Sequence, residues 1–177
     1  LLQDEVAERL RAELLVRQMS LTDELTGLYN RRGFLLLAER ELQVARRRRG
    51  RSLLLYVDLD YLKLANDRFG HAAGDGMLLD AAGLLRSLFR TTDVVARIGG
   101  DEFVVLASHY STSEEVLTRL DKAQQSFQQR TGRPLSLSVG AAESSLQPDQ
   151  SLEQLLTQAD AAMYANKCSR RRLQAVG

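Results

Sequence analysis

The sequence predicts an α+β domain, in which helices accompany a sheet, and three patterns indicate this class. Two β-prone runs, 94–96 and 104–106, flank the Gly99-Gly100 pair and predict an antiparallel hairpin. The apolar run over 52–58 is typical of a strand that is buried on both faces. Apolar side chains at helical spacing predict helices near 77–88, 113–130 and 151–167. A chain of 177 residues is long enough to build one core from these elements.

Composition indicates a globular protein. Hydrophobic residues make up 44% and charged residues 27%, and the net charge of +1 gives no overall electrostatic case for nucleic acid or a membrane surface. The single cysteine, Cys168, excludes an intrachain disulfide and suits a reducing compartment. No apolar run approaches the roughly 18 residues of a membrane span. We therefore expect a cytoplasmic domain with no membrane contact of its own, in a parent chain that could carry a membrane or sensor part because this segment begins with Leu1.

The first 21 residues are expected to form a connector helix, separate from a domain over 22–177. Ala7, Leu10, Leu14 and Leu21 follow a heptad-like spacing among charged residues. Such a helix can pack on its own domain, or it can pair with a second copy as a coiled coil. The pattern is shorter than the three or four heptads that would decide between these alternatives.

Within the domain, the first helix is expected over about 31–47 with Asn30 as its cap, and it ends in an arginine cluster that favours a solvated helix end over a phosphate site. Asp58 closes the buried strand that follows. A carboxylate in that position is costly unless it is paired or binds a metal. Asp60 is expected to cap a helix over 61–69.

The segment over 66–75 is polar and broken by glycines, which predicts a loop around His71, and the apolar residues from Met77 onward predict the core-facing helix that follows. Asp75 then lies in the first turn of that helix, as a partner of the helix dipole, and His71 packs in the loop. A second interpretation joins Asn66 and Asp75 in one pocket. An amide can serve O6 and N7 of guanine while a carboxylate accepts from N1-H and the exocyclic amine, a donor pair that adenine lacks.

The turn of the hairpin carries two adjacent acids, Asp101 and Glu102. Like charges this close repel each other unless a cation lies beside them, and a divalent metal is the obvious candidate. The alternative is an ordinary solvated hairpin tip. The rest of the chain is expected to be structural, with a strand over 135–141 in which Gly140 marks a bend or a close contact.

Several ordered motifs resemble the GGDEF family of diguanylate cyclases from Asp23 to about Arg171. The resemblance implies a mainly antiparallel central sheet wrapped by helices, similar to the core of adenylyl cyclases and polymerase palms. The chain departs from the family pattern at Leu62, Ile98, Asn166 and Arg170, and Arg170 replaces a glycine where the chain could otherwise turn. The motifs that carry the resemblance are Asp23-x-Leu-Thr-Gly-Leu-Tyr-Asn-Arg-Arg32, Asp58-Leu-Asp-x-x-Lys63, Asn66-Asp-x-x-Gly-His71-x-x-Gly74-Asp75, Arg97-Ile-Gly-Gly-Asp-Glu-Phe103 and Leu137-Ser-Val-Gly140.

The resemblance also implies the roles of individual residues. Two divalent ions, Mg²⁺ or Mn²⁺, would be held by Asp58, the backbone carbonyl of Leu59, Asp101 and Glu102, with Asp101 as a possible proton acceptor. For guanine, the implied contacts are Asn66 and Asp75, with His71 nearby. For phosphate, they are Lys63, Lys167 and Arg171. Arg97 is a further candidate for substrate contact, and an equally strong alternative makes it an ion-pair partner at the strand end.

The reaction implied by the family condenses two GTP into cyclic di-GMP with loss of two pyrophosphates. One domain has one site, so two copies must face each other as a homodimer, which a coiled coil would favour. Arg90-Thr-Thr-Asp93 resembles the family's inhibitory site for the product, although an Arg-x-x-Asp string is more often a local ion pair. The alternative functions are a catalytically silent module that binds GTP or cyclic di-GMP and a nucleotidyl cyclase that acts on one nucleotide.

Overall fold

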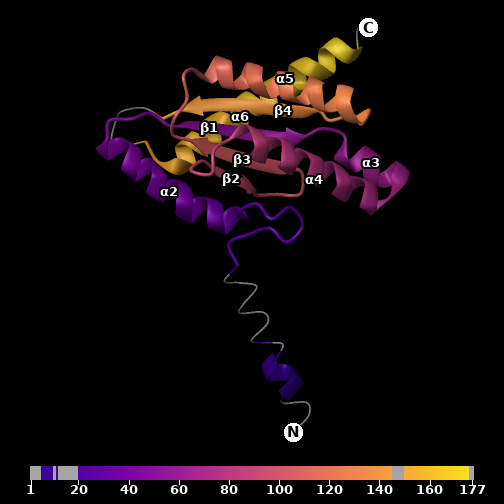
Figure 1. The fold of residues 1–177 in the computed structure, drawn as a ribbon, viewed down its shortest axis with the longest axis horizontal. Helices are drawn as coiled ribbons and strands as arrows, with labels where there is room; N and C mark the ends of the chain where they lie inside the picture. The colour runs from indigo at the N-terminus through magenta and orange to yellow at the C-terminus, as the bar shows by residue number, and fades with distance from the viewer. Residues whose placement is uncertain (1–4, 10, 12–19, 145–149, 176–177) are drawn as a thin grey trace.

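The computed structural model describes residues 5–9, 11, 20–144 and 150–175, with side chains of the last helix as far as Arg170. Within this part, helices lie on both sides of one four-stranded sheet (Figure 1). The elements in chain order are α2 (Arg31–Arg47), β1 (Leu53–Leu59), α3 (Leu62–Phe69), α4 (His71–Leu88), β2 (Val94–Arg97), β3 (Glu102–Ala107), α5 (Ser113–Thr131), β4 (Leu137–Glu143) and α6 (Leu152–Ala175).

The sheet is antiparallel throughout, in the order β2-β3-β1-β4. β1 lies inside the sheet, between β3 and β4, and six of its seven residues are buried. Leu53, Leu55 and Val57 point to one face, whereas Leu54 points to the other, because side chains alternate along a strand. The two-sided burial explains the unbroken apolar run in the sequence, and the prediction of a mainly antiparallel α+β fold is confirmed.

Two helices cover each face of the sheet. α4 and α5 pack on the face of Leu55, where Leu85 and Leu120 join the core. α2 and α6 pack on the opposite face, where Phe34 and Leu155 are almost fully buried. The apolar stripes predicted for α4, α5 and α6 are therefore confirmed.

The start of α2 also follows the prediction. Asn30 is the N-cap, and its side-chain Oδ1 accepts a hydrogen bond from the backbone N–H of Gly33 at 2.9 Å. The Asn30 amide donates to the carbonyls of Ser20 and Thr22. Asn30 thus ties Ser20 and Thr22 to the start of α2.

Three expectations about α3 and α4 were wrong. The helix expected over 61–69 is present as α3, which ends at Phe69, but no loop follows it, because α4 begins at His71 with only Gly70 between them at φ 87°. Asp75 consequently lies in the second turn of α4, where it cannot act on the first-turn dipole. Asp60 does not cap α3 either, since Tyr61 takes the cap position with a left-handed backbone at φ 65°.

The connector is described only in part. Residues 5–9 and 11 are helical, and Ser20 and Leu21 are not. Leu10 and Leu14 of the expected heptad pattern lie outside the described residues, so the boundary at residue 21 stays a prediction. Among the described residues, no helix is both long and apolar enough to cross a membrane.

Candidate nucleotide and metal site

Three acidic residues meet where β1 ends and β3 begins. The backbone N–H of Leu59 donates to the carbonyl of Asp101 at 2.8 Å, which fixes the hairpin turn beside the end of β1. Asp58 and Glu102 are directly opposite each other in the antiparallel register, so their side chains share one face of the sheet. The structure therefore brings Asp58, Asp101 and Glu102 to one edge, although Asp58 and Asp101 are 43 residues apart in the sequence.

Asp58 is buried, with a side chain that is 10% exposed, and Lys167 is its partner. Lys167 Nζ lies 2.6 Å from Asp58 Oδ1. Burial raises the pKa of Asp58, and the nearby charges of Asp101 and Asp60 raise it further, whereas Lys167 opposes both effects. The expected cost of a carboxylate at this strand end is thus offset by an ion pair, and Lys167, assigned to phosphate by the resemblance, contacts Asp58 here.

Close packing of α6 on β4 brings Lys167 to this position. Gly140 lies opposite Tyr56 in the sheet, and a Cβ atom on Gly140 would lie 2.0 Å from the backbone N of Met163 and 2.1 Å from the carbonyl O of Ala159. Only glycine permits this approach of the two backbones. Lys167 follows Met163 by about one helical turn and so reaches the end of β1. Of the two alternatives for Gly140, the structure has the close contact.

Glu102 has a different partner, which the sequence did not reveal. The Tyr56 hydroxyl donates to Glu102 Oε1 at 3.0 Å. Burial and the Glu102 carboxylate raise the pKa of Tyr56, so the hydroxyl stays protonated and remains a donor at neutral pH. A Cβ on Gly99 would lie 2.2 Å from Glu102 Oε2, so the first glycine of the signature makes room for this carboxylate.

Asp60 is held by β4 instead of capping a helix. Its two carboxylate oxygens accept from the hydroxyls of Ser136 and Ser138, each at 2.8 Å. The backbone N–H of Asp60 also donates to the carbonyl of Ser136 at 2.9 Å. Asp60 therefore fixes the chain between the end of β1 and the start of α3.

The donor set at this edge suits a hard divalent cation. Carboxylates and backbone carbonyls are the oxygen ligands that Mg²⁺ prefers, and Asp58, Asp101, Glu102 and the carbonyl of Leu59 supply them. Within the described ranges, no three His, Cys, Asp or Glu side chains are already arranged around a common point. The Asp58 and Glu102 carboxylates instead face Lys167 and Tyr56.

The residues expected at guanine lie on the α3–α4 pair. Asn66 Oδ1 is buried without a hydrogen-bond partner, and a Cβ on Gly74 would lie 1.9 Å from it. The close contact places Asn66 beside the turn of α4 that carries Asp75, which is exposed. Lys63 and His71 are also exposed, on α3 and at the start of α4. Asn66 Oδ1 is therefore packed against the backbone of α4 at Gly74.

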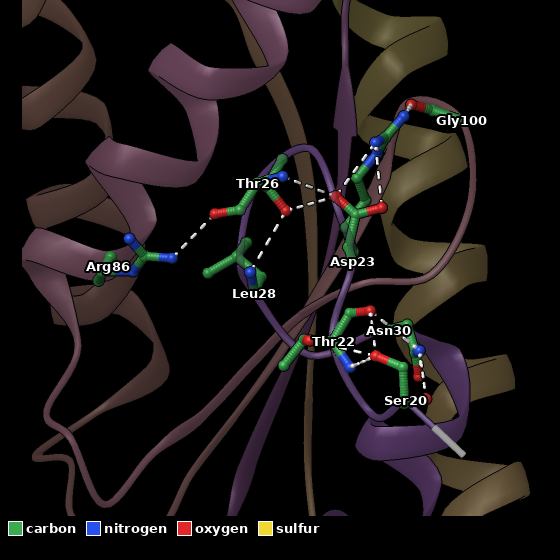
Figure 2. Close-up of polar contacts among 9 residues, drawn as sticks. Ser20, Thr22, Asp23, Thr26, Leu28, Asn30, Arg86 and Gly100 are labelled. Atoms are coloured by element: carbon green, nitrogen blue, oxygen red, sulfur yellow. Dashed lines mark hydrogen bonds and ion pairs between the residues drawn. The ribbon is translucent and has the colours of Figure 1, made fainter. Parts of the chain in front are cut away.

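Arg97 is engaged in an ion pair, as one of its two interpretations expected. Its Nη1 lies 3.2 Å from Asp23 Oδ2, and its Nη2 donates to the carbonyl of Gly100 at 2.8 Å (Figure 2). Asp23 also accepts from the backbone N–H and the hydroxyl of Thr26, and the carbonyl of Thr26 accepts from Arg86. Burial alone would raise the pKa of Asp23, but the bonds from Thr26 and Arg97 together lower it.

Arg90 and Asp93 do not form the local ion pair that such a string often makes. Asp93 Oδ2 accepts from the backbone N–H of Arg90 at 2.9 Å, and Asp93 Oδ1 accepts from the backbone N–H of Ser108 at 3.4 Å. The side chain of Arg90 lines a cavity of about 710 Å³, to which Arg51 and Arg119 also contribute. The Arg90 side chain is therefore placed beside a space that is rich in arginine.

Near the carboxyl end, α6 continues as a helix through Arg170 and Arg171. Arg170 Nη1 donates to the carbonyl of Leu137 at 2.7 Å, so the residue that replaces the family's glycine ties α6 to the start of β4. The side chain of Arg171, expected at phosphate, lies outside the described part.

Known proteins resemble this chain over most of its length. The family model described as diguanylate cyclase, GGDEF domain, matches residues 20–173. The diguanylate cyclase DgcP of Pseudomonas aeruginosa is 42% identical over 89% of this chain and 24% of its own length. The diguanylate cyclase DgcS of Shewanella oneidensis is 37% identical over 84% of this chain and 50% of its own length. This chain thus spans between a quarter and half of these curated relatives.

A solved structure has the same fold. The coiled coil and GGDEF domain of DgcB from Caulobacter crescentus, in complex with c-di-GMP, superposes with a TM-score of 0.76 at 29% identity. The match covers 95% of this chain and 93% of that one. With a family model that spans most of its residues and with these relatives, the chain belongs to the GGDEF-domain diguanylate cyclase family.

Proposed function

We propose that this chain is the catalytic part of a diguanylate cyclase that condenses two GTP into cyclic di-GMP and releases two pyrophosphates. The observation that carries the proposal is that Asp58 and Glu102 are opposite each other at the end of β1, where a backbone hydrogen bond also holds Asp101 beside Leu59. The intact acidic turn supports an active enzyme over a silent binding module. GTP as the substrate would place this activity in the cytoplasm.

Asp58, Asp101, Glu102 and the carbonyl of Leu59 are the proposed ligands of two divalent ions. When bound, such ions lower the pKa of the nucleoside 3′-hydroxyl and neutralise charge on the phosphates. Lys167 already neutralises Asp58, so this edge keeps its shape before any ligand arrives. The identity and number of the ions stay part of the proposal.

In the proposed reaction, the 3′-oxygen of each GTP attacks the α-phosphorus of the other, one pyrophosphate leaves in each of the two attacks, and each 3′-hydroxyl proton passes to the carboxylate of an Asp101. Asn66 and Asp75 orient guanine, with His71 nearby, and Lys63, Lys167 and Arg171 bind phosphate. In this assignment the Asn66 amide donates to O6 and N7 through its Nδ2, while its Oδ1 lies against Gly74 of α4. Arg97 is better explained as a residue that holds the turn, because Asp23 and Gly100 engage its guanidinium.

Each domain holds one GTP in this scheme, so a homodimer is required. The proposed division into a connector over 1–21 and a domain over 22–177 would let paired connectors bring two sites together. The solved relative DgcB, which was crystallised with its coiled coil, supports this arrangement.

The reaction is tested by incubating the protein with GTP and Mg²⁺ and identifying the product by mass spectrometry. Cyclic di-GMP with pyrophosphate is the expected outcome. Asp101→Asn should abolish the product, and Asp121→Asn, which changes an exposed carboxylate on α5, should not. A version with a parallel coiled coil fused before residue 20 excludes failure to dimerise. GTP binding without product in that version would favour the silent module, and a cyclic mononucleotide would favour the other cyclase.

Product inhibition through Arg90 and Asp93 is also proposed, supported by the solved relatives in complex with c-di-GMP. Arg90→Ala should abolish inhibition by added cyclic di-GMP, because the arginine-lined space loses its stacking and phosphate-binding group. The matched control is Arg40→Ala, an exposed arginine on α2. Inhibition and product affinity unchanged in Arg90→Ala would refute the assignment.

A further inference from the structure

Asp58 and Glu102 lie opposite each other on neighbouring strands at the proposed metal edge, and each carboxylate has its own donor. Asp58 is paired with Lys167, and Glu102 accepts from Tyr56. Tyr56 precedes Asp58 by two residues on β1, so both side chains leave the same face of the strand. Tyr56 lies opposite Val104 and diagonal to Glu102, a separation that an aromatic side chain can bridge.

The contact between Tyr56 and Glu102 limits how the carboxylate can turn. The hydroxyl holds Oε1 at 3.0 Å, and Oε2 lies over Gly99, where even a methyl group would not fit. Tyr56 is half-buried in the central strand, so its own position is set by the sheet. Oε2 remains available to a ligand while Oε1 is occupied, which is the usual arrangement when a neighbouring group orients a metal ligand.

We propose that Tyr56 is a positioning residue that orients the Glu102 carboxylate for divalent-ion binding. The inference rests on the proposed function, because it takes Glu102 as a ligand. It goes beyond that function by assigning a role to a hydroxyl outside the signature motif. Tyr56 does not contact the reacting atoms in this scheme and acts only through Glu102.

The test is Mn²⁺ binding, measured by electron paramagnetic resonance in the presence of a GTP analogue whose α-phosphate cannot be attacked. Tyr56→Phe keeps the ring and removes only the hydroxyl. We expect the dissociation constant for Mn²⁺ to rise about tenfold, the typical effect of losing a group that orients a ligand. Tyr164→Phe, which removes an exposed hydroxyl from α6, is the matched control and should leave Mn²⁺ binding unchanged.

A double-mutant cycle distinguishes a role of Tyr56 in orienting Glu102 from a merely structural role. Glu102→Gln should weaken Mn²⁺ binding, and adding Tyr56→Phe to it should weaken binding no further, because Tyr56 acts through the carboxylate. The metal-free unfolding midpoint of each variant checks that the domain is folded. An unchanged or tighter Mn²⁺ affinity in Tyr56→Phe, or additive effects in the double variant, would overturn the inference.

The binding measurement does not depend on turnover. If the wild-type protein binds Mn²⁺ with the analogue and makes no cyclic di-GMP, the proposed reaction fails while the shift in Tyr56→Phe still decides the inference. If the wild-type protein makes cyclic di-GMP and Tyr56→Phe binds Mn²⁺ normally, the inference fails and the reaction stands.

Discussion

The ion pair between Asp23 and Arg97 allows a quantitative test of how the hairpin turn is held. Asp23 accepts two hydrogen bonds from Thr26, at 2.9 Å and 2.6 Å, and pairs with Arg97 at 3.2 Å. The Asp23 side chain is 22% exposed and that of Arg97 15%, so solvent screening reduces their attraction only in part. Hydrogen bonds to a charged group contribute about 1.5 kcal/mol each, and a partly screened ion pair about 1 kcal/mol.

Two substitutions at Asp23 separate these contributions. Asp23→Ala removes every contact and should lower the free energy of unfolding by about 4 kcal/mol, whereas Asp23→Asn keeps an acceptor for Thr26 and should cost about 1 kcal/mol. Both are measured by urea denaturation at pH 7. In an Arg97→Gln background, the cost of Asp23→Asn should nearly vanish, because the two residues act as a pair.

The pH dependence gives a second readout for the same pair. The pKa of Asp23 is lowered in the folded protein, so its stabilisation is present above the ordinary value of 3.8 and is lost as the pH falls through the lower folded value. The stability difference between wild type and Asp23→Asn should be constant near neutral pH and should shrink in acid. An equal cost for Asn and Ala, or a full cost of Asp23→Asn without Arg97, would refute this account.

Three further outcomes are expected elsewhere in the domain. Asp58→Asn should abolish product formation, yet raise the metal-free urea midpoint at pH 7. Burial raises the pKa of Asp58 even with the Lys167 pair in place, so the ionised form costs stability above that pKa, and the gain from Asn should shrink at acid pH. Gly140→Ala should lower the free energy of unfolding by about 3 kcal/mol, because the added methyl group overlaps the backbone of α6. Urea denaturation measures the effect, and an unchanged midpoint would contradict the close contact. Asn66→Ala should raise KM for GTP about tenfold in steady-state kinetics, and an unchanged KM would remove Asn66 from the guanine site.

The sequence predicted a helix or strand well where its position depends on residues only a few positions apart in the chain. Asn30 was recognised as a cap because its side chain serves the backbone three residues later, and the start of α2 followed. The glycines at 70, 74 and 76 misled the prediction of α4. Gly74 lies inside the helix because α3 packs against it, a contact that propensity does not encode.

The polar partners in the site were less predictable, because they come from distant segments. Asp60 looked like a helix cap, but its partner Ser138 lies on β4 and its partner Ser136 just before that strand, which only the sheet order brings alongside. Lys167 is 109 residues from Asp58 in the sequence. The resemblance to the family identified Lys167 as a site residue. Its contact with Asp58 depends on the close packing of α6 against Gly140, which the sequence motif does not reveal.

The ion pair of Lys167 with Asp58 affects the stability that we expect of the metal-free protein. A built-in ammonium group already balances the carboxylate that a divalent ion would otherwise have to neutralise. Stripping ions with a chelator should therefore halt turnover while leaving the heat-denaturation curve almost unmoved. Chelation then works as a reversible off-switch for the chemistry alone, which distinguishes this domain from small metalloproteins that unravel when their ion is withdrawn.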